Sequence, residues 1–333
     1  MSTILERAKG AVDVAKDKAS TKNSGAGGFY SLPPAGRYAI YAVGTVVAYF
    51  LANALLPNNL PIGIVVLGSV FGSFYALTAI GLVLIYRANR VVNFAQADIG
   101  AVAGVLAISF NLHGLNYFLS IISGLLIAAL IGAFVNVAVI RRFRQAPRLI
   151  VAVATIGLAQ ILSGIALVIP LLWRSSGRFE TPFEARFRIN PAVFNGNHLL
   201  AMLAIPAIML AVIAFLRFSD YGVVIRAAAE NGDRASLLGI PVPRLSTIVW
   251  AIAGVLSATA VILRVPILGF TSFVSVSGAG NALLLRTLAA AVIGRMESLP
   301  RTVIAALAMS ALMTTGASAA SDWPNRPVRI LST

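Results

Sequence analysis

Three charged residues at helical spacing are the most chemically distinctive feature of this chain. Arg226, Glu230 and Arg234 follow one another at i, i+4 and i+8, so a helix would present them as one charged stripe. The three alanines at 227–229 leave the adjoining surface nearly smooth. The segment lies between two long apolar runs and must therefore face water. A smooth, charged surface of this kind predicts close contact with another protein.

The ends of this helix are also marked in the sequence. Asp220 is suited to cap its start, Gly239 stands where a left-handed residue ends a helix, and Pro241 prevents continuation. We therefore expect one helix within residues 219–240.

A second group of polar residues lies at the start of another apolar run, in the segment Asn93-Phe94-Ala95-Gln96-Ala97-Asp98-Ile99-Gly100. It reads as a chain break followed by a new helix that begins near Ala95. Asn93, Gln96 and Gly100 share one face of that helix, whereas Asp98 points elsewhere. Asp98 either stabilises the first turn through the helix dipole or belongs to a translocation path. Asn93 and Gln96 either line such a path or tie the broken backbone to neighbouring helices.

No catalytic constellation is present in the sequence. There is no Gly-x-x-x-x-Gly-Lys-(Ser/Thr) phosphate loop and no plausible Ser/His/Asp arrangement. Cysteine is absent, and the two histidines, His113 and His198, have no carboxylates near them, so turn or interface roles are expected for them. We expect no catalytic residue, no metal site and no cofactor in this chain.

The amino-acid composition indicates whether the chain folds in water or in a lipid bilayer. Hydrophobic residues make up 59% of the 333 residues and charged residues only 11%, against about 25% charged in soluble domains. Seven runs contain no Asp, Glu, Lys or Arg, and most match the roughly 20 residues of a membrane crossing. These runs are 38–56, 61–86, 99–140, 149–173, 189–216, 245–263 and 265–285. The chain is therefore expected to be an all-α, polytopic integral membrane protein.

About eight transmembrane helices are predicted, together with one broken or re-entrant element. The crossings are expected near 38–56, 61–86, 98–112, 115–140, 149–173, 198–217, 245–264 and 302–320. The run 99–140 supplies two of them, hinged near His113 and Gly114. The region 265–294 carries too much glycine, serine and proline for a simple span, so it is expected to line a cavity. Arg264 and Arg286 flank this region and are expected to snorkel to a membrane interface.

The net charge of +15 does not indicate nucleic-acid binding. Most Lys and Arg residues lie in short clusters between apolar runs, on the side predicted to be cytoplasmic by the positive-inside rule. Residues 1–37 form a basic, polar cytoplasmic tail without the apolar core of a signal peptide. This tail is either a weak helix on the membrane surface or disordered, and attraction to anionic membrane lipid is expected.

Both polar segments resemble the branched-chain amino acid permease family of ABC importers. The pattern Gly222…Ile225-Arg226-Ala227…Ala229-Glu230-Asn231…Ala235…Leu238-Gly239-Ile240 is similar to the family's cytoplasmic coupling loop, and residues 93–100 match a second family segment. The resemblance implies ATPase coupling by Arg226, Ala227, Ala229, Glu230, Asn231, Arg234 and Gly239. It implies a translocation path at Asn93, Phe94, Gln96, Asp98 and Gly100.

The same resemblance implies a transmembrane permease domain over residues 38–320 in the bacterial inner membrane. Expected partners are a second permease subunit, homologous or identical, cytoplasmic ABC ATPases that bind the ATP, and a periplasmic substrate-binding protein. The outer segment 174–197 is either part of the docking face for that binding protein or a solvated loop. Alternatives are the same machinery importing urea, short amides or another amino acid, or an ion-coupled secondary transporter. Ion coupling expects intramembrane carboxylates, and only Asp98 is a candidate. A non-transporting scaffold would not explain the broken helices.

The resemblance covers roughly residues 60–308. From about residue 305 the chain resembles a secretory signal region joined to the mature start of a periplasmic tricarboxylate-type solute receptor. An apolar core, the small-residue run 317–320 and the Trp323-Pro324…Pro327 opening carry this second likeness. A gene junction or frameshift would explain the atypical tail 321–333 and a shortened last helix, and so would simple divergence. Sequencing the end of the gene distinguishes the two.

Overall fold

The fold is known from a computed structural model. It describes residues 61–143, 146–175, 179, 181–183, 185–230, 232–268 and 279–321. The predicted tail 1–37, the crossing 38–56 and the C-terminal residues 322–333 lie outside this part of the chain.

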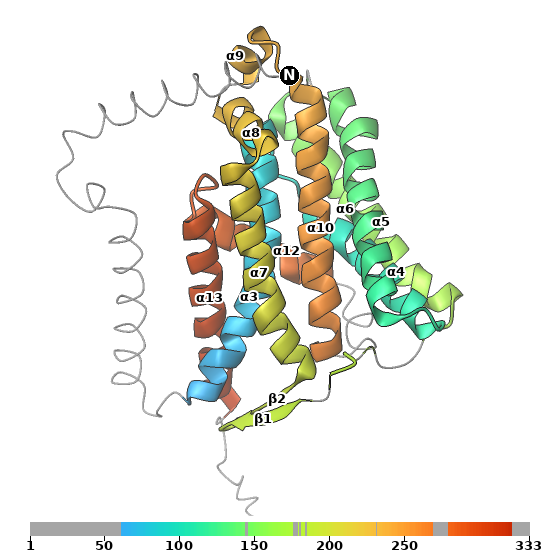
Figure 1. Cartoon of the computed structure of the whole chain (residues 1–333), viewed down its shortest axis with the longest axis vertical. Coiled ribbons are helices and arrows are strands. Elements are labelled where there is room, and N and C mark those ends of the chain that lie inside the picture. Colours follow the sequence, from blue (N-terminus) through green and yellow to red (C-terminus); the bar gives the residue numbers. More distant parts are fainter. Residues whose placement is uncertain are drawn as a thin grey trace, which may run out of the picture.

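Helices account for most of the described residues (Figure 1). The α-helices are α3 (Ile62–Asn89), α4 (Gln96–Leu112), α5 (Tyr117–Ala138), α6 (Arg148–Leu172), α7 (Gly196–Phe218), α8 (Asp220–Glu230), α9 (Gly232–Leu237), α10 (Val242–Leu268), α12 (Ala279–Ile293) and α13 (Leu299–Ser321). A 3-10 turn, η2 (Ile140–Phe143), follows α5.

The helices reproduce the predicted crossings within the described part of the chain. Five are long and apolar enough to cross a membrane: α3, α5 with its 3-10 extension, α6, α7 and α10. Helices α4 and α13 occupy the other two predicted positions. The run 99–140 does form two helices, with the turn between them at His113 to Asn116, where Gly114 has a φ of 98°.

The surface of the bundle is apolar. On α5, Leu126, Leu130 and Phe134 are more than 60% exposed and follow one another at helical spacing. Similar residues cover α6 and α7, including Leu149, Leu171 and Leu203. Water would not tolerate so much contiguous apolar surface, whereas lipid does. The prediction of an all-α, polytopic membrane protein is confirmed.

Helix α10 forms the centre of the bundle and packs on α3, α4, α5 and α7 (Figure 1). Trp250 and Leu256 of α10 are almost fully buried. Close helix contacts depend on small residues, which let backbones approach each other. A Cβ atom on Gly100 of α4 would lie 2.6 Å from the Ser257 carbonyl oxygen, and one on Gly254 would lie 2.5 Å from the Ala128 carbonyl oxygen of α5.

A short hairpin lies at the end of the bundle opposite to α8 and α9 (Figure 1). Strand β1 (Arg186–Ile189) pairs antiparallel with β2 (Ala192–Asn195), with Phe187 opposite Phe194 and their rings stacked at 5.3 Å. The sequence predicts only an outer loop here, because the strands are four residues long. Asn195 then caps α7 by accepting from His198 N at 3.3 Å.

The predicted broken element is only partly covered by the structure. Helix α10 continues past Arg264 to Leu268, and α12 is an uninterrupted helix from Ala279. The Gly- and Ser-rich residues 269–278 lie outside the described residues. A re-entrant segment there stays a prediction.

Candidate functional site

Helix α8 begins where α7 ends, and Ser219 joins the two. The Ser219 hydroxyl accepts a hydrogen bond from Gly222 N at 3.0 Å and so caps α8. Asp220 is the first residue of the helix instead, where its carboxylate is favourable with the helix dipole. The predicted cap at Asp220 is therefore wrong by one residue.

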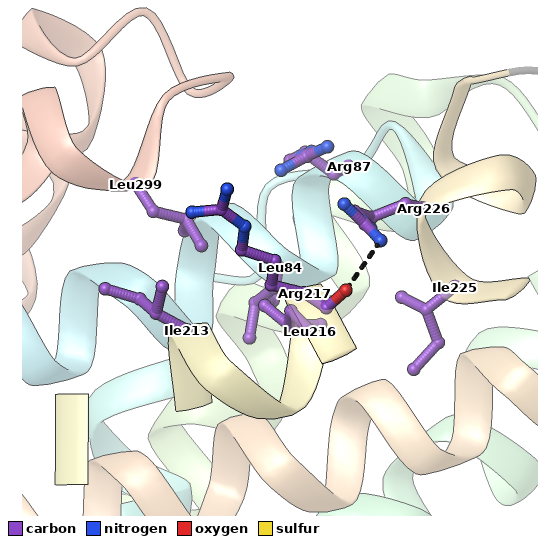
Figure 2. Close-up of a pocket in the computed structure, with 8 residues that line it drawn as sticks. All are labelled: Leu84, Arg87, Ile213, Leu216, Arg217, Ile225, Arg226 and Leu299. Atoms are coloured by element: carbon purple, nitrogen blue, oxygen red, sulfur yellow. Dashed lines mark hydrogen bonds between the residues drawn. The ribbon is translucent and has the colours of Figure 1, made fainter. Parts of the chain in front are cut away.

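Arg226 anchors α8 to the end of α7. Its Nη2 donates to the Arg217 carbonyl oxygen at 3.2 Å, and its Nε donates to the Gly222 carbonyl oxygen at 3.4 Å (Figure 2). The Arg217 carbonyl is one of the last four of α7, which have no partner within their own helix. Ile225 and Ala228 bury the inner face of α8 against the bundle. Displacement of α8 therefore pulls directly on α7.

A pocket of about 290 Å³ lies beneath this anchor, between the ends of α3, α7 and α8 and the start of α13. It is lined by Leu84, Arg87, Ile213, Leu216, Arg217, Ile225, Arg226 and Leu299. In Figure 2 the three guanidinium groups lie toward one side and Ile213, Leu216 and Ile225 toward the other. Glu230 and Glu297 are close enough to act electrostatically on Arg87. Arg87 and Arg217 were not among the predicted site residues, although each directly follows a charge-free run.

Two helices, α8 and α9, are described within the predicted helix 219–240, one on each side of Asn231. A single helix that carries Arg226, Glu230 and Arg234 as one stripe stays a prediction. Ala227 is half-buried and Glu230 is exposed at the end of α8. Asn231 and the side chains of Ala229 and Arg234 lie outside what the structure describes.

Gly239 ends this segment as predicted. Its φ of 79° is left-handed. Gly239 N donates to the Ser236 carbonyl oxygen and Ile240 N to the Ala235 carbonyl oxygen, both at 3.0 Å. These two bonds form a Schellman motif, and Pro241 then precedes α10. The motif fixes the direction in which the chain enters α10.

The first turns of α10 are tied to the end of α5. Arg141 Nη2 donates to the Pro243 carbonyl oxygen and to Thr247 Oγ1, each at 2.9 Å. Thr247 Oγ1 in turn donates to Asn136 Oδ1 at 3.0 Å. The start of α10, which follows α9 in the chain, is thus fixed to the end of α5.

The segment 93–100 lies inside the bundle. Helix α4 begins at Gln96 after Ala95, as the sequence predicts. Asn93 Oδ1 accepts from Ala95 N at 3.0 Å, and Asn93 Nδ2 donates to Gln96 Oε1 at 3.1 Å. Gln96 Nε2 donates to the Ala253 carbonyl oxygen of α10 at 2.8 Å. Both amides are fully buried and tie the broken backbone to α10.

Other residues of this segment are also enclosed. Phe94 N donates to Thr155 Oγ1 of α6 at 3.3 Å. Gly100 packs against Ser257, whose hydroxyl donates to the Gln96 carbonyl oxygen at 2.7 Å. Asp98 is 2% exposed, and its Oδ2 has no hydrogen-bond partner among the described residues. A translocation role for the five predicted residues stays a prediction.

Replacing Gln96 by leucine should destabilise the folded chain, because it leaves the buried Asn93 Nδ2 without its acceptor. A buried unsatisfied polar group costs about 1–3 kcal/mol. The thermal midpoint of the detergent-solubilised protein measures this. Asn111→Leu is the matched control, since Asn111 Nδ2 donates to the Leu115 carbonyl oxygen at an exposed turn. Equal midpoints for the two variants would contradict the assigned network.

A third polar cluster was not predicted. Arg264 of α10 is only 8% exposed, so it does not snorkel to an interface, and the expectation that it does is wrong. Its guanidinium lies 5.9 Å from the centre of the Tyr75 ring. Arg286 of α12 lies 5.5 Å from the same ring, and its Nη1 donates to Tyr75 Oη at 2.5 Å. The signal for this cluster in the sequence was two arginines that each interrupt or end a long apolar run, Arg264 between the charge-free runs 245–263 and 265–285 and Arg286 directly after the second.

Comparison with known proteins places these features in context. A family described as "Branched-chain amino acid transport system / permease component" matches residues 64–332, a range that extends past the predicted limit near residue 308. The origin of the C-terminal tail itself stays a prediction.

Individual relatives agree with this match. The chain is 28% identical to the high-affinity branched-chain amino acid transport system permease protein LivH of Salmonella typhimurium, over 72% of this chain and 80% of LivH. LivH of Escherichia coli K12 is 27% identical over the same shares. BraD of Pseudomonas aeruginosa, with the same description, is 25% identical over 77% of this chain and 86% of BraD. No solved structure matches the chain significantly.

Proposed function

The chain belongs to the permease family of branched-chain amino acid transport systems, and we propose that it is the membrane-spanning subunit of a binding-protein-dependent ABC importer. It is a multi-pass inner-membrane protein. The proposed cargo is a branched-chain amino acid, because relatives with similar sequences are described as permeases of such systems.

We propose that ATP is bound and hydrolysed by separate ATPase subunits. The proposed assembly contains a second permease, homologous or identical, and a periplasmic substrate-binding protein that docks at the hairpin end. The permeases are surrounded by membrane lipid. In this proposal the chain itself binds no ATP and catalyses no reaction.

The observation that carries the proposal is the way α8 is attached. Its inner face is buried on the bundle through Ile225 and Ala228, Arg226 bonds the end of α7, and Glu230 is exposed to solvent. An ATPase that engages the outer face of α8–α9 would therefore move α7 and the start of α10 together. This coupling would convert closure of the nucleotide-bound ATPase dimer into a change of access to the translocation path.

Uptake into proteoliposomes tests the function. The whole assembly, with its receptor, should accumulate labelled leucine only when ATP is supplied on the cytoplasmic side. Uptake of labelled urea and acetamide, which carry no charge, is measured in the same way to test the alternative cargoes. Accumulation without ATP in the presence of a proton or sodium gradient would refute the proposal and favour ion coupling through Asp98.

A further inference from the structure

We propose that Arg264 and Arg286 bind the carboxylate of the transported molecule inside the membrane. This inference rests on the proposed function and names the chemical group that the permease recognises. It follows from the position, burial and charge of three side chains on three helices.

Two of the three members of the cluster lie at the middle of apolar helices. Tyr75 is at the middle of α3, which runs from Ile62 to Asn89, and Arg286 is at the middle of α12, Ala279–Ile293. Arg264 is one turn from the end of α10, and its side chain reaches the same Tyr75 ring as Arg286. Lipid phosphates lie at the membrane surface, so a lipid headgroup is not the natural partner at this depth.

The two guanidiniums lack a countercharge within the described helices. Arg264 Nε and Nη1 are buried and have no hydrogen-bond partner in this part of the chain. Asp98 is the only Asp or Glu in the described membrane helices. Gly100 packs on Ser257 and Gly104 on Val261, so α4 and α10 run parallel at this contact. Asp98 therefore lies about nine residues, or roughly 13 Å, below Arg264 along the bundle.

An uncompensated arginine at membrane depth is costly and typically marks a substrate pathway. The Tyr75 ring offsets only part of that cost, because both cations share one ring and repel each other. A carboxylate offers what is missing, since it accepts parallel hydrogen bonds from a guanidinium and cancels its charge. Arg286 is half-buried and thus reachable by a ligand.

The chemistry also separates the candidate cargoes. An amino acid carries a carboxylate that neutralises the site, whereas urea and short amides carry no charge. The cluster therefore favours a carboxylate-bearing cargo over the neutral alternatives.

The test uses the complete assembly in proteoliposomes with Arg264→Gln and Arg286→Gln, the charge-preserving Arg264→Lys, and the control Arg148→Gln at the exposed start of α6. Each glutamine variant should lower ATP-driven leucine uptake about 30-fold or more, as expected for loss of one partner of a buried charge pair. Arg264→Lys should retain part of the uptake, and Arg148→Gln should behave as the unaltered chain.

Thermal stability and composition of the assembly distinguish binding from structure. Arg264→Gln removes a buried cation whose Nε and Nη1 have no hydrogen-bond partner among the described residues, so its thermal midpoint should be no lower than that of the unaltered protein. A clear fall in the midpoint would identify a structural role and overturn the inference. Loss of the second permease on purification would assign the countercharge to that subunit and overturn it equally.

Failure of the proposed function is separable from failure of this inference. If the unaltered assembly does not accumulate leucine with ATP, the proposed function fails. If it does and both glutamine variants transport within twofold of it, only the carboxylate site fails.

Discussion

Charge reversal at Glu230 is expected to abolish ATP-driven uptake while the partner ATPases still hydrolyse ATP. Glu230 is exposed at the C-terminal end of α8, where a carboxylate is unfavourable with the helix dipole. Its presence there does not serve the helix, and its exposed carboxylate, which also acts electrostatically on Arg87, is available for a contact outside the chain. Like charges facing each other across an interface cost several kcal/mol, enough to lower coupled uptake by a factor of about 100 or more.

The measurement compares leucine uptake and ATP hydrolysis in the same proteoliposomes. Glu230→Arg should lose uptake, whereas Glu230→Gln should lose only part of it. Asp220→Asn is the matched control, because Asp220 is an exposed carboxylate at the opposite end of the same helix. Unaltered uptake by Glu230→Arg would remove the coupling role of α8.

The same substitution, glycine to alanine, should have opposite effects on stability at two positions. A Cβ on Gly254 would lie 2.5 Å from the Ala128 carbonyl oxygen, so α5 and α10 would have to separate. We expect Gly254→Ala to cost about 1–3 kcal/mol, as overpacked cores do, and the double variant with Gly100→Ala to be less stable still. Gly164 of α6 has no atom within 4 Å of the corresponding position. There alanine should stabilise the helix by about 0.5–1 kcal/mol.

Thermal midpoints of the solubilised chain, followed by size-exclusion chromatography, measure both effects. For each variant, the sign of the change in thermal midpoint matters more than its size, since helix propensity alone favours alanine at both positions. Stabilisation by Gly254→Ala would mean that α5 and α10 are not in backbone contact.

Much of the architecture could be predicted because a helix that crosses lipid needs a long apolar run, which is easily recognised in a sequence. Runs without charge predicted the described crossings, and the His113–Gly114 turn was found between two of them. Gly239 was identified correctly because few residues other than glycine adopt a left-handed conformation at a helix end. The start of α4 followed from the polar break at Asn93.

The arrangement of side chains was less predictable, since spacing along a helix does not say what each face meets. Arg226, expected on a surface stripe, turns back to the Arg217 carbonyl oxygen. Arg264 was expected at an interface, but its neighbour across the bundle is Tyr75 of a helix far away in sequence. Ser219 rather than Asp220 caps α8. Both residue types are favoured at that position, so the sequence alone does not choose between them.

The glycine contacts also determine which helix can move. Sliding α4, α5 and α10 past one another would force side chains into the hollows at Gly100 and Gly254, so shear is blocked and these helices move as a rigid body. Helix α7 has no glycine after Gly196, and Pro206 interrupts its hydrogen-bond ladder at mid-length. A push on α8 is therefore expected to bend α7 at Pro206, where the hydrogen-bond ladder of this helix is interrupted.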